Sequence, residues 1–430
     1  MILIYTHTIT PRIKYTVDLI FNVVLHCPYN ITDDVLFYHD SVSPKIAYAN
    51  ENKGFTVFLK SNTLLLETDI KQKLPSSNAL YLNLPQFFST SDNSFLPYDL
   101  FATVFYFATR YEEYLPYEAD KHQRFQAEKG LSFKYQILNK PFLNILIQDF
   151  ATKLKLRFPQ LEFKKRAYNF LSTIDIDNAF AYANKGFKRN VGGLLKDISS
   201  FKFNKITNRI RSNINSYNDP YNTFDFINSL SEASKTTLHY FVLIGDYSDY
   251  DKNPHYQNKE FRSLLKSLSL KHVVGLHPSY KSFNNLEKIA IEKKRLEDII
   301  EEKITSARCH FLRINFPETY RAFIAAGITD DYTMIYASQS GFRTGLCVPY
   351  LWFDLQKNES TNLTIHPSTV MEGTLRDYNK LGSAQATICI NQLMQEVKNN
   401  GGEFVSIWHN DSFVAEQQEW INIYKKMLSL

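Results

Sequence analysis

From about residue 166 to its end, the chain alternates short apolar runs of strand length with longer segments of helical periodicity. Eight runs are predicted strands, spanning 170–175, 237–245, 272–277, 307–314, 333–336, 345–353, 363–365 and 403–408. One helical segment places Leu286, Ile289, Leu296 and Ile300 near one face. Repeated strand–helix units favour a mainly parallel sheet, and eight strands suggest a (β/α) barrel of the α/β class.

Residues 1–165 follow a different pattern, in which short strands accompany one strongly apolar helix. Alternation over 55–59, followed by three leucines at 64–66, predicts a hairpin. We therefore expect two domains. A smaller α+β domain spans 1–165, with a role that the sequence does not indicate, and the barrel spans 166–430.

The apolar helix of the first part begins near Pro97 and Asp99, which are favourable helix-start residues, and continues to Arg110. It is apolar on most faces, so we expect it to be buried. The segment that follows is dense in charge and contains Arg110, Glu112, Glu113, Asp120, His122 and Arg124. These charges could form a partner or substrate surface, or an ion-pair network that fixes one domain to the other; we favour the network.

Composition and charge are those of an ordinary globular protein. Hydrophobic residues make up 44% of the 430 residues and charged residues 22%, which argues against a disordered chain. The formal net charge is +5 and no arginine-rich tract occurs, so nucleic-acid binding is not favoured. The sequence does not determine the oligomeric state.

The N-terminal segment lacks the basic region, apolar run and small-residue cleavage site of a signal peptide. No segment reaches about 18 uninterrupted apolar residues, so no membrane span is predicted. The four cysteines, Cys27, Cys309, Cys347 and Cys389, are far apart and show no CxxC spacing. Reduced thiols and a cytoplasmic location are therefore expected.

Two acids close the first predicted strand of the second part: Asp175 and Asp177, separated by Ile176. Side chains at positions i and i+2 of a strand project to the same face, so the two carboxylates repel each other unless a positive group joins them. An arginine, a metal ion or water alone are the three candidates for that position.

Other strand ends carry side chains of complementary chemistry. These are His277, Ser279 and Tyr280 after the third strand, Arg308, His310 and Arg313 in the fourth, and Trp408, His409, Asn410 and Asp411 at the last. In a barrel the C-terminal strand ends gather at one rim. A carboxylate with several imidazoles there predicts a site for a divalent metal such as Zn²⁺. Taken singly, each residue also has a structural interpretation, as a core side chain, a rim salt bridge or a helix cap.

At these residues the second part resembles the polysaccharide deacetylase family, also called NodB-like or carbohydrate esterase family 4. The segment TIDID is similar to the first motif of that family, GLHPSY to its histidine motif, ARCHF to its arginine motif and SIWHN to its last motif. The whole chain looks closest to an uncharacterised bacterial branch. The resemblance implies a distorted NodB-like (β/α) barrel over about 260 residues.

The resemblance also implies catalytic roles. Asp175 would be the general base, oriented by Arg308, and His409 the general acid. Asp177 and His277 would bind the metal, which would be zinc, with cobalt and nickel as the other candidates. The reaction would be hydrolysis of an acetyl group from an N-acetylated sugar or polysaccharide precursor.

Further residues would support this reaction. Trp408, or a nearby carboxylate such as Asp411, would position the general acid. Tyr280, Trp408 and Arg313 would contact the sugar.

Two departures from the family pattern concern the metal site. The acids of the usual first motif are adjacent, whereas here Ile176 separates them, a form that some members share. The usual histidine motif has a second imidazole four residues after the first, and that position is Lys281. His310 stands where the arginine motif usually has proline, and it is the candidate third ligand because neighbouring strands lie only about 4.8 Å apart.

Two other interpretations stay open. Without the second histidine, the barrel could have lost its metal and act only as a carbohydrate-binding or scaffold protein. Alternatively, D-x-D occurs in glycosyltransferases that hold a nucleotide-sugar through a divalent ion, although no glycine-rich strand–helix turn precedes Asp175. His366, which follows another predicted strand, has no assigned role.

Overall fold

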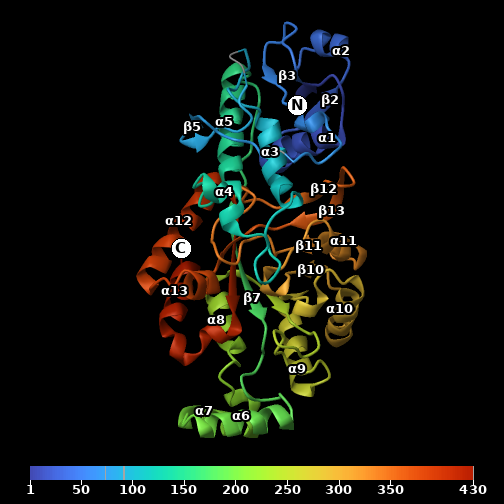
Figure 1. Cartoon of the computed structure of the whole chain (residues 1–430). Coiled ribbons are helices and arrows are strands. Elements are labelled where there is room, and N and C mark those ends of the chain that lie inside the picture. Colours follow the sequence, from blue (N-terminus) through green and yellow to red (C-terminus); the bar gives the residue numbers. More distant parts are fainter. Residues whose placement is uncertain (73, 91–92, 430) are drawn as a thin grey trace.

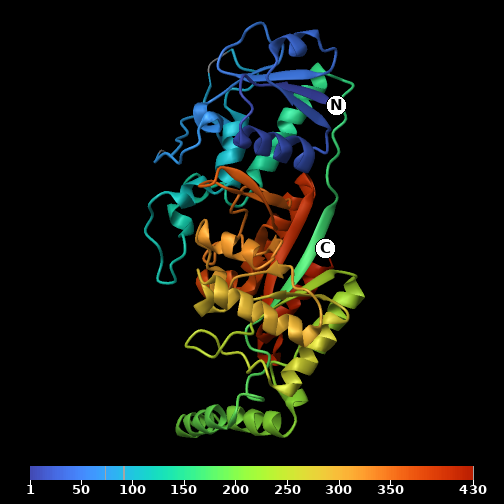
Figure 2. The same cartoon turned by 90° about the vertical axis from the view of Figure 1, so that its right-hand side faces the viewer.

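The computed structural model describes residues 1–72, 74–90 and 93–429 (Figure 1). The N-terminal part lies at one end of an elongated molecule and a large sheet occupies the middle. Helices α6 (Phe187–Ser199) and α7 (Phe203–Ile214) lie at the other end (Figures 1 and 2). Within the described residues, no helix combines the length and the apolar character needed to cross a bilayer.

The first sheet contains four parallel strands in the order β2-β1-β3-β4. Their bounds are Ile2–Tyr5 (β1), Tyr29–Thr32 (β2), Lys45–Ala49 (β3) and Phe58–Lys60 (β4). The predicted hairpin is wrong, because β4 pairs in parallel with β3 and the leucines after it form a short 3₁₀ helix. Leu64 and Leu65 are buried in the main core instead of extending along a sheet.

Five α-helices accompany this sheet: α1 (Pro11–Val17), α2 (Val35–Asp40), α3 (Leu100–Ala108), α4 (Leu131–Lys134) and α5 (Phe142–Arg157). Every residue of α3 is buried, which confirms the prediction for the apolar helix. The Asp99 carboxylate caps α3 by accepting a hydrogen bond from the backbone N–H of Ala102 at 2.9 Å.

The charged segment after α3 contains the ion-pair network that we favoured. Arg110 Nε lies 2.8 Å from Glu113 Oε1, and Glu113 Oε2 lies 2.5 Å from Arg343 Nη2, with all three side chains buried. Glu112 accepts a further bond from Arg110 at 2.8 Å. The network therefore ties the end of α3 to the chain near Arg343, more than 200 residues later.

The second sheet has nine strands in the order β12-β13-β11-β10-β9-β8-β7-β15-β14. Their bounds are Tyr168–Ile176 (β7), Thr237–Val242 (β8), Val273–Leu276 (β9), Ser306–Ala307 (β10), Asp330–Asp331 (β11), Tyr350–Asp354 (β12), Glu359–Ile365 (β13), Ser368–Met371 (β14) and Gly402–His409 (β15). All neighbours are parallel except β12 and β13. The α/β class and the mainly parallel sheet are confirmed.

The sheet curls as a half-barrel, and this corrects the expectation of a closed (β/α) barrel. Its edge strands, β12 and β14, do not pair with each other in the part of the chain that the structure describes. The runs predicted at 345–353 and 363–365 form the antiparallel β12–β13 hairpin, which ends the parallel order on one side. The run at 333–336 is not a strand, whereas β14 was not predicted.

Helices flank this sheet (Figure 1). They are α8 (Phe224–Ser234), α9 (Lys259–Ser269), α10 (Leu286–Ile300), α11 (Glu318–Ala325), α12 (Ser383–Asn400) and α13 (Gln418–Leu428). The predicted amphipathic helix is α10, which Asn285 caps by accepting a hydrogen bond from Lys288 N. Its apolar face buries Ile289, Leu296 and Ile300 in the main core.

His366 lies in an ion pair away from the predicted metal residues. Its Nε2 is 3.0 Å from Asp330 Oδ1, its Nδ1 is 3.2 Å from Glu403 Oε2, and Tyr332 stacks on the ring at 4.3 Å. Glu403 is near the start of β15, opposite the end that carries His409. Burial lowers the pKa of His366, but the two carboxylates outweigh it and raise that pKa to about 9.

This ion pair predicts a pH-dependent contribution to stability. Because folding raises the pKa of His366, the ion pair stabilises the protein fully below the pKa of the unfolded chain, about 6.5. This stabilisation is lost as the pH rises through the folded pKa of about 9. His366→Gln should remove this dependence. Urea unfolding of both proteins between these pH values measures it; an unchanged pH slope in the variant would contradict the assignment.

Candidate metal centre

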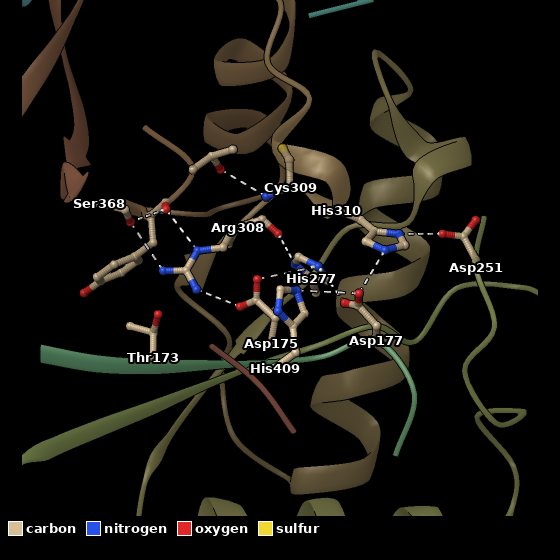
Figure 3. Close-up of polar contacts among 12 residues, drawn as sticks. Thr173, Asp175, Asp177, Asp251, His277, Arg308, Cys309, His310, Ser368 and His409 are labelled. Carbon is tan, nitrogen blue, oxygen red and sulfur yellow. Dashed lines mark hydrogen bonds and ion pairs between the residues drawn. The ribbon is translucent and has the colours of Figure 1, made fainter. Parts of the chain in front are cut away.

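The candidate centre forms where β7, β9 and β15 end (Figure 3). Asp175 is the next-to-last residue of β7 and lies opposite His409 of the neighbouring strand β15. Asp177 follows directly after β7. His277 follows β9. As expected for parallel strands, their carboxyl ends bring these side chains to one edge of the sheet.

His310 reaches the same place by a different route. The strand predicted over 307–314 ends after Ala307, and the chain turns through a short 3₁₀ segment. Phe311 and Leu312 adopt positive φ angles of 60° and 55° in this turn, an uncommon backbone conformation for such residues. The turn, rather than a continuing strand, brings the His310 ring towards Asp177.

Asp177, His277 and His310 offer three ligand atoms that all lie within 4.8 Å of one another. Asp177 Oδ1 is 3.2 Å from His277 Nε2, and Asp177 Oδ2 is 3.4 Å from His310 Nε2. Metal bonds of about 2.0–2.1 Å to imidazole and carboxylate place neighbouring ligand atoms of a tetrahedron about 3.3–3.4 Å apart. The two distances from the Asp177 carboxylate to the imidazoles therefore match the spacing of neighbouring ligands in a zinc site.

A contact at Nδ1 holds each imidazole ring in place. His277 Nδ1 is 2.6 Å from the carbonyl oxygen of Arg308, which only accepts, so Nδ1 carries the proton. His310 Nδ1 is 3.0 Å from the Asp251 carboxylate. In the neutral rings each Nε2 then presents its lone pair to Asp177, the arrangement found around bound metals.

The carboxylate of Asp177 supports the same interpretation. Its Oδ1 atom is buried and has no hydrogen-bond partner among the described residues. Burial raises the pKa of Asp177, but His310 and His277 outweigh this and hold it well below its usual range. Burial also lowers the pKa of His310, whereas Asp177 and Asp251 raise it to about 9. A positive charge between these side chains, carried either by protons or by a metal ion, would therefore stabilise the cluster.

Asp175 is held beside this cluster by Arg308, as predicted. Arg308 Nη1 is 2.7 Å from Asp175 Oδ1, and both side chains are buried. Arg308 also donates from Nε to the Tyr332 carbonyl at 3.0 Å and lies over the Phe241 ring. These contacts fix the guanidinium, which orients the Asp175 carboxylate.

His409 is positioned by Glu372, a residue that sequence analysis missed. His409 Nδ1 is 2.8 Å from Glu372 Oε1, which also accepts a bond from Ser412 Oγ at 2.7 Å. Burial lowers the pKa of His409, but Glu372 outweighs it and the pKa rises well above its ordinary value. The predicted positioning groups, Trp408 and Asp411, do not provide this contact.

A cavity of about 170 Å³ opens on the cluster. Five predicted site residues line it: Asp175, Asp177, His277, His310 and His409. Arg124 and Tyr378 also line it and supply polar groups near the centre. Arg124 comes from the charged segment after α3, and it donates to the Phe311 carbonyl at 2.8 Å.

The predicted substrate residues do not line this cavity. Trp408 is fully buried and packs against Phe413, Trp420 and Tyr424, so the expectation of a sugar contact is corrected to a core role. It points away from the edge because neighbouring residues of a strand alternate between faces.

Arg313 and Tyr280 form a separate cluster. Arg313 lies between the rings of Tyr280 and Phe283, 3.9 Å from each centroid, and donates to the Tyr280 carbonyl at 2.7 Å. Tyr280 also stacks on Tyr250 at 4.1 Å. Neither side chain lines the cavity at the candidate centre, and their predicted sugar contacts stay predictions.

Asp251 and Glu372 were missed for different reasons. Glu372 follows β14, and the strand-end rule would have found it had the run Ser-Thr-Val-Met at 368–371 been read as a strand. Asp251 lies in the long loop after β8 and carries no comparable signal. It also accepts hydrogen bonds from Ser248 Oγ and Tyr280 N.

Comparison with known proteins gives a limited result. Residues 2–159 match the model of a family of unknown function, DUF7033. No curated protein matches the chain.

Solved structures that are similar to it include two polysaccharide deacetylase structures. A candidate polysaccharide deacetylase from Mycobacterium smegmatis is 13% identical, with a TM-score of 0.41 over 61% of this chain and 83% of that one. The polysaccharide deacetylase Bc1974 from Bacillus cereus is 14% identical, with a TM-score of 0.29 over 62% and 88%. Likenesses of this strength do not support a functional argument, so the function of this chain has to be argued from the chemistry of its site.

Proposed function

We propose that this protein is a metal-dependent deacetylase that hydrolyses the acetyl group of an N-acetylated sugar or polysaccharide precursor. The convergence of Asp177, His277 and His310, with both histidines oriented through Nδ1, carries the proposal. Asp175 and His409 at the same cavity supply the base and the acid that amide hydrolysis needs. The resemblance of the four strand-end motifs to NodB-like enzymes points to the same reaction.

The ligand set fits a zinc ion, with cobalt and nickel as the other candidates. One carboxylate and two imidazoles leave positions open for water and substrate, as in catalytic zinc sites. When bound there, such an ion supplies a Lewis acid that activates water and polarises the acetyl carbonyl. Asp251 and the Arg308 carbonyl keep the two imidazoles in the tautomer that binding requires.

The remaining residues divide the proton transfers between them. Asp175, oriented by Arg308, accepts the proton of the attacking water. His409 donates Nδ1–H to Glu372, which leaves Nε2–H available for the departing amine. Without that proton the amine is a poor leaving group, so His409 acts as the general acid.

We also propose that residues 166–430 are the catalytic part and that residues 1–165 complete the cavity through Arg124. Arg124 is positioned by Asp120, whose Oδ2 lies 2.8 Å away, and it borders the cavity together with Tyr378. A guanidinium and a phenol at a cavity mouth are suitable hydrogen-bond donors for sugar hydroxyls.

The metal-free binding alternative explains the site less well. In that case two oriented imidazoles and a carboxylate would have to be balanced by protons alone. No described feature of the chain favours the glycosyltransferase alternative, which would leave His277, His310 and His409 without a role.

Metal removal tests the proposal. Protein stripped with a chelator and reloaded with zinc is expected to release acetate from N-acetylglucosamine oligomers in proportion to bound zinc, whereas stripped protein should be inactive. Cobalt- and nickel-loaded samples establish which ion is used. Oligomer binding without acetate release in every metal form would replace the deacetylase with the binding alternative.

A further inference from the structure

Helices α6 (Phe187–Ser199) and α7 (Phe203–Ile214) form an antiparallel pair inserted between β7 and α8, at the same end of the sheet as the candidate site. Figures 1 and 2 show this pair lying across one end of the molecule. The helices are joined by the Asp197–Arg209 ion pair at 2.8 Å. Gly193 permits this contact, because a Cβ atom there would lie 2.5 Å from the Arg209 guanidinium.

The pair exposes apolar side chains at helical spacing. On α6 these are Phe187, Val191, Leu195 and Ile198, and on α7 they are Phe203, Ile210 and Ile214. Phe187 is 83% exposed and Ile214 is 81% exposed. A soluble protein rarely leaves so many apolar side chains together in water without a binding function.

Part of this apolar surface forms one wall of a groove of about 1330 Å³. Phe187, Val191, Leu194, Ile210 and Ile214 face the opposite wall, which is the loop after β8. The groove is several times larger than the candidate metal cavity and is mainly apolar in its lining. An extended hydrocarbon chain fits these properties better than a free sugar does.

The groove is also cationic. Lys185, Arg189 and Arg209 line it, and no acidic residue is among its described lining residues, although Asp197 behind the wall pairs with Arg209. Arg189 stacks on Tyr247 at 4.3 Å and donates to the Lys252 carbonyl, so its charge has no carboxylate partner in these contacts. The pKa of Lys185 is lowered to about 8, mainly by burial and next by the nearby Arg189. An anion beside Lys185 would stabilise its charged form.

The charge of the helix pair differs from that of the rest of the chain. Residues 185–214 contain eight lysines and arginines against one aspartate, whereas the whole chain carries only +5. A basic segment with an apolar face is typical of contact with anionic lipids.

We propose that this groove binds a phosphate-headed lipid, with its hydrocarbon chain against the apolar face of α6 and α7 and its phosphate at Lys185 and Arg189. Ammonium and guanidinium groups pair strongly with phosphate, and the apolar wall removes the chain from water. The loop that supplies the opposite wall also contains Asp251, which does not line the groove but orients His310. On the basis of the proposed function, the deacetylase substrate would then be a sugar attached to a lipid phosphate.

Calorimetric titration of the full chain with dodecyl phosphate, kept below its critical micelle concentration, tests the groove directly. We expect saturable binding of one molecule per chain, at least about tenfold tighter than binding of uncharged dodecyl maltoside. Inorganic phosphate at the same concentration should not bind measurably, because it lacks the chain.

Two variants locate the site. Ile214→Asp places a negative charge on the apolar wall and should weaken dodecyl phosphate binding at least about tenfold. Arg189→Gln should weaken dodecyl phosphate but leave dodecyl maltoside unchanged. The matched control is Ile388→Asp on α12, an isoleucine that is 58% exposed and far from the groove in sequence, which should change neither.

Three results would overturn the proposal: equal affinity for both detergents, unchanged binding by Ile214→Asp, or binding only to vesicles that contain phosphatidylglycerol. The last result would assign the helix pair to a bilayer surface instead. None of these measurements requires catalysis, and Ile214→Asp should still release acetate from soluble oligomers. A negative result for lipid binding in the groove can therefore be told apart from a negative result for deacetylase activity.

Discussion

Replacement of Asp177 by alanine is expected to remove the bound zinc and the release of acetate together. Asp177 is the only carboxylate in the three-residue ligand set among the described residues, and both imidazoles point at it, at 3.2 Å and 3.4 Å. Without it, two neutral nitrogens would hold the ion, and affinity falls steeply with the loss of a charged ligand. Elemental analysis of the purified variant measures zinc per chain, and an acetate assay measures activity.

Asp175→Asn is the matched control, because it changes a carboxylate two residues away whose near partner is Arg308 at 2.7 Å, with His277 of the ligand set farther away at 3.9 Å. This variant should retain zinc and lose about 10²–10⁴-fold in kcat, the usual contribution of a general base. Zinc retained by Asp177→Ala at the wild-type level would refute the ligand assignment. Full activity of Asp175→Asn would refute the assignment of the base.

Glu113→Gln is expected to destabilise the protein by about 3–5 kcal/mol, the usual cost of breaking a buried ion network. Glu113 is the shared partner of Arg110 and Arg343, and the three side chains are between 1% and 4% exposed. Burial raises the pKa of Glu113, but the two guanidinium groups outweigh it and keep the carboxyl ionised. An uncharged amide would leave Arg343 without its carboxylate partner and Arg110 with Glu112 alone.

Urea unfolding followed by circular dichroism measures this effect. The matched control is Glu301→Gln, which breaks the exposed ion pair with Lys266 and should not change stability measurably. Equal stability of Glu113→Gln and the wild type would contradict this prediction. The wild-type network would then contribute little to holding the end of α3 near Arg343.

Local sequence patterns predicted most of the secondary structure around the site. The alternation of apolar runs with amphipathic segments is a property of residues a few positions apart, and it correctly placed β7, β8, β9, β15 and α10. The rule that parallel strands end at one edge then brought Asp175, Asp177, His277 and His409 together. These four predictions needed no knowledge of the packing.

The rest depended on contacts between distant segments. His310 reaches Asp177 only because the chain leaves its strand after Ala307 and turns, and a periodicity pattern cannot foresee a two-residue strand. The orienting carboxylates, Asp251 and Glu372, lie 59 and 37 residues from the histidines that they contact. Such pairs depend on how the sheet curls and how its loops fold back.

The sequence therefore sufficed for the class of the fold, for the four strands and the helix named above, and for the chemical types that gather at one edge. Tertiary packing selected the third metal-type ligand, the partners that orient each imidazole, and a half-barrel instead of a closed barrel. The physical reason is range: periodicity and capping act over one or two turns, whereas ligand geometry and sheet closure depend on hydrogen bonds and charges between residues far apart in the chain.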